Sequence, residues 1–167
     1  TAYRRQRQMC IRDRLIKSRK RGKRMSNVYV VYWSGTGNTQ EMAMAIADGA
    51  KENGAEVTVW NVDEADIEEL KKAKALALGC PSMGAEQLEE ASMEPFMCDL
   101  DSQINGKTIA LFGSYGWGDG QWMKDWEDRI ASDGATVLNG EGIIANNEPS
   151  QEIIDECREA GKALANM

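Results

Sequence analysis

Short apolar runs alternate along this chain with stretches of helical spacing, and this alternation limits the possible folds more than any other feature. The apolar runs span 28–33, 56–60, 73–80 and 107–114, and a fifth run is split into 135–138 and 142–145. The helical stretches span 41–50, 66–71, 91–99, 121–132 and 151–165. Parallel strands need such crossover helices, and strands that are apolar throughout are covered on both faces. The sequence therefore predicts an α/β fold, a doubly wound parallel sheet of five strands with helices on both faces.

A loop of small polar residues and glycines follows the first apolar run, Ser34-Gly35-Thr36-Gly37-Asn38-Thr39. Backbone N–H groups, two glycines that allow close approach, and the positive end of a helix dipole are all available there to an anion. The loop has no Lys or Arg, so neutral donors would hold a phosphate, which suits a tightly bound monoester. The P-loop pattern is absent. An ordinary helix N-cap is the alternative, but a cap needs one small polar residue and this loop has four.

Two more loops follow apolar runs, Pro81-Ser82-Met83-Gly84-Ala85-Glu86 and, after Ser114, Tyr115-Gly116-Trp117-Gly118-Asp119-Gly120. In a doubly wound sheet, ligands bind outside the carboxyl ends of the strands, where the strand order reverses. Met83 and Trp117 each stand beside a glycine, and such side chains can sandwich a planar ring. Taken singly, Met83 could fill a gap in the core and Trp117 could be a surface anchor. With the first loop, they predict a site for a ligand that carries a phosphate and a planar ring.

Charge is distributed very unevenly. Residues 1–24 contain eleven Lys and Arg and one Asp, whereas residues 25–167 contain nine Lys and Arg and 26 Asp and Glu, a net charge of −17. A region this acidic favours basic protein surfaces and does not seek nucleic acid. No apolar run approaches the roughly 20 residues of a membrane span. We therefore predict neither a nucleic-acid partner nor a membrane partner.

Histidine is absent, and the four cysteines form no C-x-x-C pair. These two facts argue against a zinc site and against Cys-His or Ser-His catalysis. Scattered thiols in a chain without a secretory signal favour a reducing cytoplasm. Each cysteine is most simply a small core residue or a surface thiol.

The basic segment 1–24 leaves three interpretations open: a tail for nucleic acid or anionic lipid, a transit peptide, or sequence outside the mature protein. It lacks the apolar segment of a secretory signal. The chain begins with Thr, and Met25 directly precedes the first strand. We therefore expect translation to begin at Met25, with 1–24 a disordered or non-native leader and 25–167 the ligand-binding domain.

Residues 25–167 resemble the flavodoxins, specifically the short-chain clostridial type. The matching segments are 31–39 with Ala43 and Ile46, then Gly79-Cys80, Met83-Gly84, Glu86, 94–96, 110–120 and 147–149. The resemblance implies one FMN bound non-covalently and low-potential, one-electron transfer between redox proteins in place of ferredoxin. It also implies the strand order 2-1-3-4-5 with FMN at the switch point, which is the arrangement already known for flavodoxin itself.

The resemblance also implies roles for individual residues. By matching position, Ser34, Thr36, Asn38, Thr39 and the loop amides would hold the phosphate. Met83 and Trp117 would cover the two faces of the isoalloxazine, and Glu86 would accept a hydrogen bond from its N3–H. The full set implied for FMN is Ser34, Gly35, Thr36, Gly37, Asn38, Thr39, Pro81, Ser82, Met83, Gly84, Ala85, Glu86, Ser114, Tyr115, Gly116, Trp117, Gly118 and Asp119. No catalytic residue and no metal ligand is implied.

One position departs from the family pattern. In flavodoxins, the peptide after the glycine that corresponds to Gly84 turns so that its carbonyl accepts a hydrogen bond from the reduced flavin. Ala85 stands where relatives of this type usually have Asp. If that turn needs a positive φ at this position, Ala costs about 1 kcal/mol. We expect weaker stabilisation of the flavin semiquinone than in Gly-Asp relatives.

The implied partners are redox proteins with basic docking faces: ferredoxin-dependent oxidoreductases, ferredoxin or flavodoxin reductases, and hydrogenase or nitrogenase reductase. We expect a cytoplasmic monomer that transfers electrons and is not an enzyme. The alternative is an FMN-dependent NAD(P)H:quinone reductase of the same fold, which would need a second substrate pocket over the flavin. A response-regulator receiver needs an acidic cluster after the first strand and an Asp at the end of the third strand. The first strand ends in Trp33-Ser34 and the third in Gly79-Cys80, which argues against a receiver.

Overall fold

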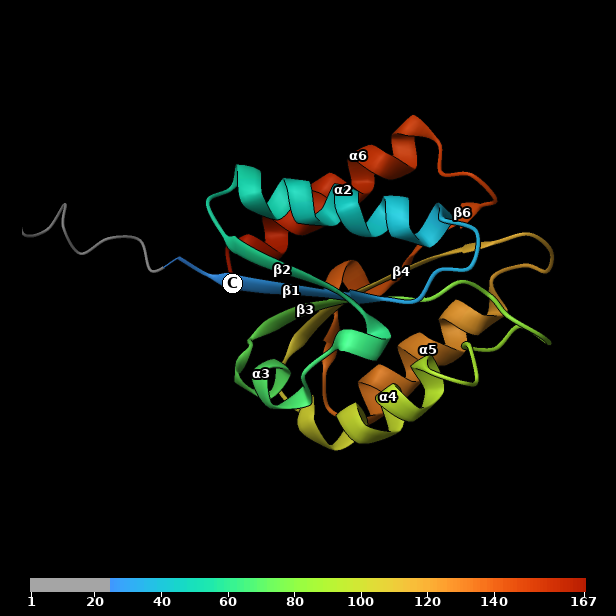
Figure 1. Ribbon diagram of the computed structural model, residues 1–167, viewed down its shortest axis with the longest axis horizontal. Coiled ribbons are helices and arrows are strands. Elements are labelled where there is room, and N and C mark those ends of the chain that lie inside the picture. Colours follow the sequence, from blue (N-terminus) through green and yellow to red (C-terminus); the bar gives the residue numbers. More distant parts are fainter. Residues whose placement is uncertain (1–24) are drawn as a thin grey trace, which may run out of the picture.

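The strands form one parallel sheet in the computed structural model of this chain, which describes residues 25–167 (Figure 1). The predicted leader, 1–24, lies outside the described residues. The strands are β1 (Asn27–Tyr32), β2 (Glu56–Asn61), β3 (Ala75–Gly79), β4 (Thr108–Tyr115), β5 (Thr136–Val137) and β6 (Ile143–Asn146). Their order is β2-β1-β3-β4-β5, with β6 also paired to β4. This order confirms the predicted fold class.

Helices cover both faces of the sheet (Figure 1). On one face lie α2 (Asn38–Glu52) and α6 (Gln151–Ala165), and on the other lie α3 (Ile67–Lys72), α4 (Met93–Leu100) and α5 (Gln121–Ser132). Short 3-10 turns follow β2, α4 and β5: η1 (Val62–Glu64), η2 (Asp101–Gln103) and η3 (Leu138–Gly140). No helix within 25–167 is long and apolar enough to cross a membrane.

Each face of the sheet packs its own hydrophobic core, because successive side chains of a strand point to opposite faces. In β3, Leu76 and Leu78 belong to the core beneath α3, α4 and α5, whereas Ala77 belongs to the core beneath α2 and α6. The second core is rich in alanine, which lets α2 and α6 approach closely. A Cβ added at Gly49 or Gly161 would overlap the backbone of the facing helix. Most of the largest fully buried side chains, Trp122 and Trp126 among them, lie on the α4 and α5 side, whereas Phe112, Met42 and Ile46 lie beneath α2 and α6.

The fifth apolar run is indeed split. β5 pairs with β4 at Thr108 and Ile109, and β6 pairs with β4 further along, from Phe112 to Tyr115. Between them, η3 contains Asn139 at φ 60°. Because β6 continues beside β4 to the carboxyl end of the sheet, the residues that follow it arrive at the same edge as the predicted loops.

The first helix begins earlier than the sequence predicts. Gly37 has φ 95° and is the N-cap of α2, so Asn38 and Thr39 belong to the first helical turn and not to the loop. Glycine adopts this left-handed conformation without strain, which lets the chain turn from the loop directly into the helix. The polar loop and the helix N-terminus are therefore adjacent, as the predicted anion site requires.

Candidate functional site

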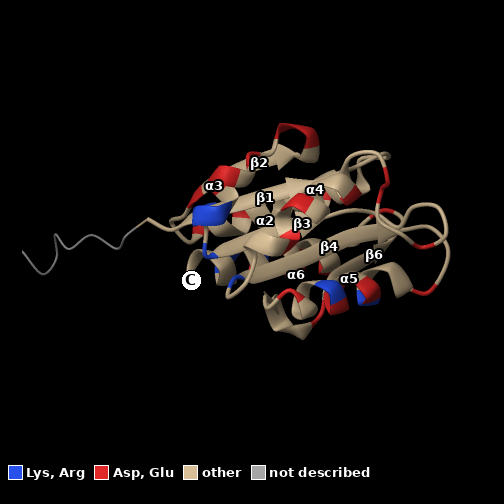
Figure 2. Cartoon of the chain, turned by 90° about the horizontal axis from the view of Figure 1, so that it is seen from below, with Lys and Arg blue, Asp and Glu red and all other residues tan. Residues whose placement is uncertain are grey.

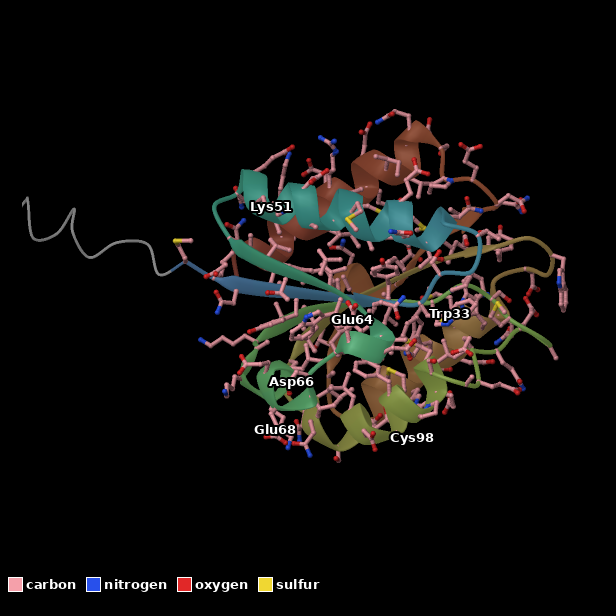
Figure 3. All side chains as sticks on the ribbon, viewed as in Figure 1. Trp33, Lys51, Glu64, Asp66, Glu68 and Cys98 are labelled. Atoms are coloured by element: carbon pink, nitrogen blue, oxygen red, sulfur yellow. The ribbon has the colours of Figure 1, made fainter. Side chains whose placement is uncertain are left out.

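The carboxyl ends of the strands carry a cavity of about 240 Å³. Figure 3 places Trp33 at this end of the sheet, whereas Glu68 lies towards the other end. The lining residues come from all three predicted loops and from the segment after β6: Trp33, Gly35, Thr36, Asn38, Pro81, Ser82, Met83, Ser114, Tyr115, Gly116 and Asn147. The topology thus brings together loops that are far apart in the sequence.

The set of predicted site residues omitted Trp33 and Asn147. Trp33 ends the first apolar run, and its N–H donates to the Gly79 carbonyl at 3.0 Å, which fixes its backbone beside β3. The Asn147 N–H donates to the Tyr115 carbonyl at 2.7 Å. Sequence signals for both existed, because Trp33 directly precedes the polar loop and Asn147 lies in a segment that matches the flavodoxin pattern.

The N-terminus of α2 opens towards the polar loop without a side-chain cap. The Gly37 N–H donates to Ser34 Oγ at 3.0 Å, so the Ser34 hydroxyl closes the loop as an acceptor and keeps its own proton to donate. By contrast, α6 is capped in the ordinary way, with Ser150 Oγ accepting from the Ile153 N–H. The first-turn amides of α2 therefore find no side-chain acceptor among the described residues at this end, which is the arrangement that binds anions.

Thr39 lies behind the cavity wall. Thr39 is 1% exposed, and its hydroxyl lies 3.2 Å from the Ser114 hydroxyl. Ser114 is also buried and does line the cavity. Thr39, predicted to hold a phosphate, therefore joins the first turn of α2 to the end of β4 through its side chain.

Gly35 passes close to the ring of Trp33. A Cβ added at Gly35 would lie 3.1 Å from Trp33 Cη2, which is tighter than ordinary van der Waals contact. The polar loop thus passes closely over the indole ring. A side chain at position 35 would require the loop or the ring to shift by a few tenths of an ångström, and both line the cavity.

Met83 and Gln87 close a tight loop beside the cavity. Their backbones exchange two hydrogen bonds, Met83 N–H to Gln87 O at 2.9 Å and Gln87 N–H to Met83 O at 2.8 Å. Gly84 and Glu86 both have φ 54°, while Ala85 is not among the positive-φ residues of 25–167. The strain expected for Ala85 is thus carried by Glu86 in this conformation, and the hypothesis of weaker semiquinone stabilisation stays a prediction.

The remaining predicted residues lie around the cavity and not in its wall. Trp117 is 65% exposed and Met83, which does line the cavity, is 36% exposed, so both can be reached from solvent. Glu86 Oε1 accepts a hydrogen bond from the Asp119 N–H at 3.1 Å. Of the predicted set, Ser34, Gly37, Thr39, Gly84, Ala85, Glu86, Trp117, Gly118 and Asp119 do not line the cavity. That Met83 and Trp117 enclose a ring therefore stays a prediction.

A larger groove of about 480 Å³ lies next to this site, between the 86–90 segment and α5. Buried Trp122 and Trp126 form part of its lining. The other lining residues are Glu86, Gln87, Leu88, Glu90, Glu94, Asp125 and Arg129. Four carboxylates thus face one guanidinium, which leaves the groove acidic. In Figure 2, the loops at the carboxyl end of the sheet contain acidic residues and no visible basic ones.

Arg129 does not reverse this acidity, because its charge is already paired. Its Nη1 lies 2.7 Å from Glu94 Oε1, and its Nη2 lies 2.6 Å from Asp101 Oδ2. Burial of the guanidinium lowers its pKa, but the hydrogen bonds and charges of Asp101 and Glu94 outweigh that effect and raise the pKa overall. The guanidinium therefore ties α5 to α4 and η2.

The described residues contain three free cysteines, Cys80 and Cys157 in the interior and Cys98 on the surface. Burial raises the pKa of Cys80 to about 12 and that of Cys157 to about 12, so both thiols stay protonated. The structure thus confirms these two as core residues.

A doubly wound sheet with an uncapped helix N-terminus and three loops around a cavity at the carboxyl ends of its strands is the arrangement in which α/β proteins bind phosphate-bearing cofactors. The flavodoxin family matches residues 30–161. Flavodoxin from Clostridium beijerinckii is 49% identical over 138 residues, which are 83% of this chain and 99% of the relative. Flavodoxin from Megasphaera elsdenii is 44% identical over 138 residues, 83% of this chain and 98% of the relative.

A solved structure supports the same assignment. The solution structure of two-electron reduced Megasphaera elsdenii flavodoxin has a TM-score of 0.77 and 42% identity, and the match covers 84% of this chain and 99% of that chain. The chain therefore belongs to the flavodoxin family, whose members bind FMN and carry electrons. Membership of this family does not favour the quinone reductase alternative.

The residues of the site fit FMN. The uncapped amides of α2 and the side chains of Thr36 and Asn38 in the cavity wall would form a neutral donor set for a phosphate monoester. The Ser34 hydroxyl, which does not line the cavity but closes the same loop, would add a further donor. Gly35 and Gly116 leave the loop backbones bare beside the cavity, and a Cβ at Gly116 would lie 3.3 Å from Asn147 Oδ1. The flanking Met83 and exposed Trp117 provide a soft and an aromatic surface for a planar ring.

Proposed function

We propose that the cavity at the carboxyl ends of β1, β3 and β4 holds the phosphate and the inner part of FMN, and that the flanking loops hold the ring near the surface. The observation that carries this proposal is the cavity itself, built from three loops above the uncapped N-terminus of α2. Bound FMN supplies the one-electron chemistry. The protein supplies binding, orientation and a route for electrons to the surface.

Each loop has a distinct task in this proposal. Ser34, Thr36 and Asn38 donate to the phosphate together with the α2 amides. Pro81, Ser82, Ser114 and Tyr115 line the passage from the phosphate towards the surface. Met83 and Trp117 bracket the ring, and their exposure leaves the ring edge open to a second protein. Direct contact at that edge lets electrons pass without a further cofactor.

Partner recognition rests on charge. Residues 25–167 carry a net charge of −17, and the groove beside the flavin loops is lined by four carboxylates with one paired arginine. We assign this groove as the docking place for a basic segment of a redox partner, whose Lys or Arg side chains would meet Glu90 and Asp125. Such complementarity steers association and makes its rate depend on ionic strength.

The chain acts as a carrier and not as an enzyme in this proposal. It contains no histidine, and the two interior thiols stay protonated because burial raises the pKa of each. One-electron transfer at a ring edge requires no general acid or base from the protein. The free thiols among residues 25–167 suit a reducing cytoplasm, where we place the protein as a monomer.

The experiment is electron transfer by the full chain loaded with FMN. We expect the reduced protein to reduce cytochrome c, a basic redox protein, with a rate constant that falls steeply as the salt concentration rises. Mixing the oxidised protein with NADH and a quinone should give no turnover. Steady NADH oxidation without a second protein would contradict the carrier assignment and favour the reductase.

A further inference from the structure

A single carboxylate connects the two loops that flank the predicted ring site. Glu86 lies in the tight loop closed by Met83 and Gln87, and its Oε1 accepts a hydrogen bond from the Asp119 N–H at 3.1 Å. Glu86 is half-buried, whereas residues 116–119 are exposed. The loop from 117 to 119 is thus held from one side by a residue 33 positions earlier in the chain.

Gly118 fits against the same carboxylate. It has φ 86°, and a Cβ added there would overlap Glu86 Oε1 and Cδ. The Glu86 carboxylate therefore occupies the space beside the 118–119 peptide that a side chain at position 118 would need. Because Gly118 has no side chain, the Glu86 carboxylate can lie directly against the backbone at position 118.

The backbone of Glu86 is strained in this arrangement. Its φ of 54° lies in the left-handed region, which an L-residue other than Gly, Asn or Asp adopts at a cost. Such strain persists only where surrounding contacts overdetermine it. The two Met83–Gln87 backbone hydrogen bonds on one side and the Asp119 N–H on the other are those contacts.

We propose that Glu86 is a positioning residue that fixes the 117–119 loop, and with it Trp117, against the 84–86 loop before FMN binds. This inference rests on the proposed function, because it gives Trp117 its place at the ring. It adds to the ring contact that the family resemblance implies for Glu86. Among the described residues, Glu86 Oε2 has no hydrogen-bond partner, so one oxygen can hold the loop while the other accepts from the ring.

Loop preorganisation has a measurable consequence for binding. A loop that is ordered before the ligand arrives loses less conformational entropy on binding, and this raises affinity. A variant that keeps an uncharged acceptor at position 86 should keep the loop in place even where it weakens the ring contact. A variant without an acceptor at position 86 should lose both the fixed loop and the contact with the ring.

The first test uses the full-length apoprotein, so it does not depend on FMN. Hydrogen exchange of the Asp119 amide, followed by NMR, should be about tenfold faster in Glu86→Ala than in the parent, the fold-change expected from losing one charge-assisted hydrogen bond. Glu86→Gln should restore most of the protection, because its carbonyl still accepts. Glu90→Gln, which removes a neighbouring exposed carboxylate, should leave the exchange rate of the Asp119 amide unchanged.

The second test isolates the contact between Glu86 and Gly118. Gly118→Ala should raise the FMN dissociation constant about tenfold more in the parent than in the Glu86→Ala background, because removing the carboxylate also removes the overlap. Equal effects in both backgrounds would overturn the proposal, as would an Asp119 amide whose exchange is unchanged in Glu86→Ala. Failure of the parent to bind FMN would instead contradict the proposed function. The exchange measurement on the apoprotein would still test whether Glu86 holds the 117–119 loop.

Discussion

The hydroxyl groups of Thr39 and Ser114 lie 3.2 Å apart, beneath the point where the first turn of α2 meets the end of β4. Both residues are buried, and the Ser114 N–H also approaches Thr39 Oγ1, at 3.4 Å. The contact joins residues 75 positions apart in the sequence. It therefore sets the spacing between two walls of the cavity, the polar loop and the loop that follows β4.

Thr39→Val should destabilise the protein by about 1–2 kcal/mol, because the shape is kept while the Ser114 hydroxyl loses its partner in the interior. Urea unfolding of the apoprotein measures this effect. Thr136→Val, at an exposed strand position, is the control and should be nearly neutral. If Thr39→Val costs no more than this control, the hydroxyl pair does not hold the two walls together.

Glu89 should make stability depend on pH in acid. Its carboxylate accepts from the N–H groups of Ala91, Ser92 and Met93 at 2.8–2.9 Å, which satisfies the amides of the turn that leads into α4 and the first amide of α4 itself. Burial raises the pKa of this carboxyl, but the three hydrogen bonds outweigh that effect and lower the pKa overall. A lowered pKa in the folded state stabilises the protein above the unfolded-state pKa, about 4.3, and this contribution is lost as the pH falls below it.

Glu89→Gln should therefore cost about 1–2 kcal/mol at pH 7, since the amide cannot accept from all three N–H groups. The gap between parent and variant should hold down to about pH 4.3 and narrow below it. Urea unfolding at several pH values measures this difference in the free energy of unfolding. Glu90→Gln is the matched control, and its free energy of unfolding should equal that of the parent. A gap that widens in acid would contradict the assigned sign.

The acidic groove should govern association with basic partners. Glu90→Gln combined with Asp125→Asn should slow reduction of cytochrome c severalfold at low salt, with the difference shrinking as salt screens the charges. Asp48→Asn combined with Glu56→Gln removes the same charge elsewhere, on α2 and at the amino end of β2. An equal loss of rate in both double variants would mean that total charge governs association and the groove does not.

The alternation of apolar runs and helices was enough to predict the sheet, because parallel strands covered on both faces leave a strong pattern. Even the split of the fifth run was visible, since Asn139-Gly140 interrupts it. The start of α2 was harder to place. Asn38 and Thr39 are residues typical of loops, and only the left-handed conformation of Gly37 shows that the helix begins directly after it.

The loops of the site could be predicted, but their mutual contacts could not. Nothing in the local sequence indicates that the Thr39 hydroxyl turns to Ser114, or that Glu86 reaches the Asp119 amide, because both contacts depend on how distant strands are paired. The lining roles of Trp33 and Asn147 likewise follow from the sheet register and from the path of the chain after β6.

The measurement that tests the central claim most directly compares the binding of FMN and of riboflavin to the full-length apoprotein. Quenching of the flavin fluorescence reports the binding of each ligand. The two ligands differ only in the phosphate, so the difference in affinity reports on the α2 N-terminus and its loop. We predict one FMN per chain, at least about 100-fold tighter binding of FMN than of riboflavin, and loss of most of that preference in a Ser34→Ala, Thr36→Val double variant. Equal affinity for the two flavins would contradict the claim that this loop holds the phosphate.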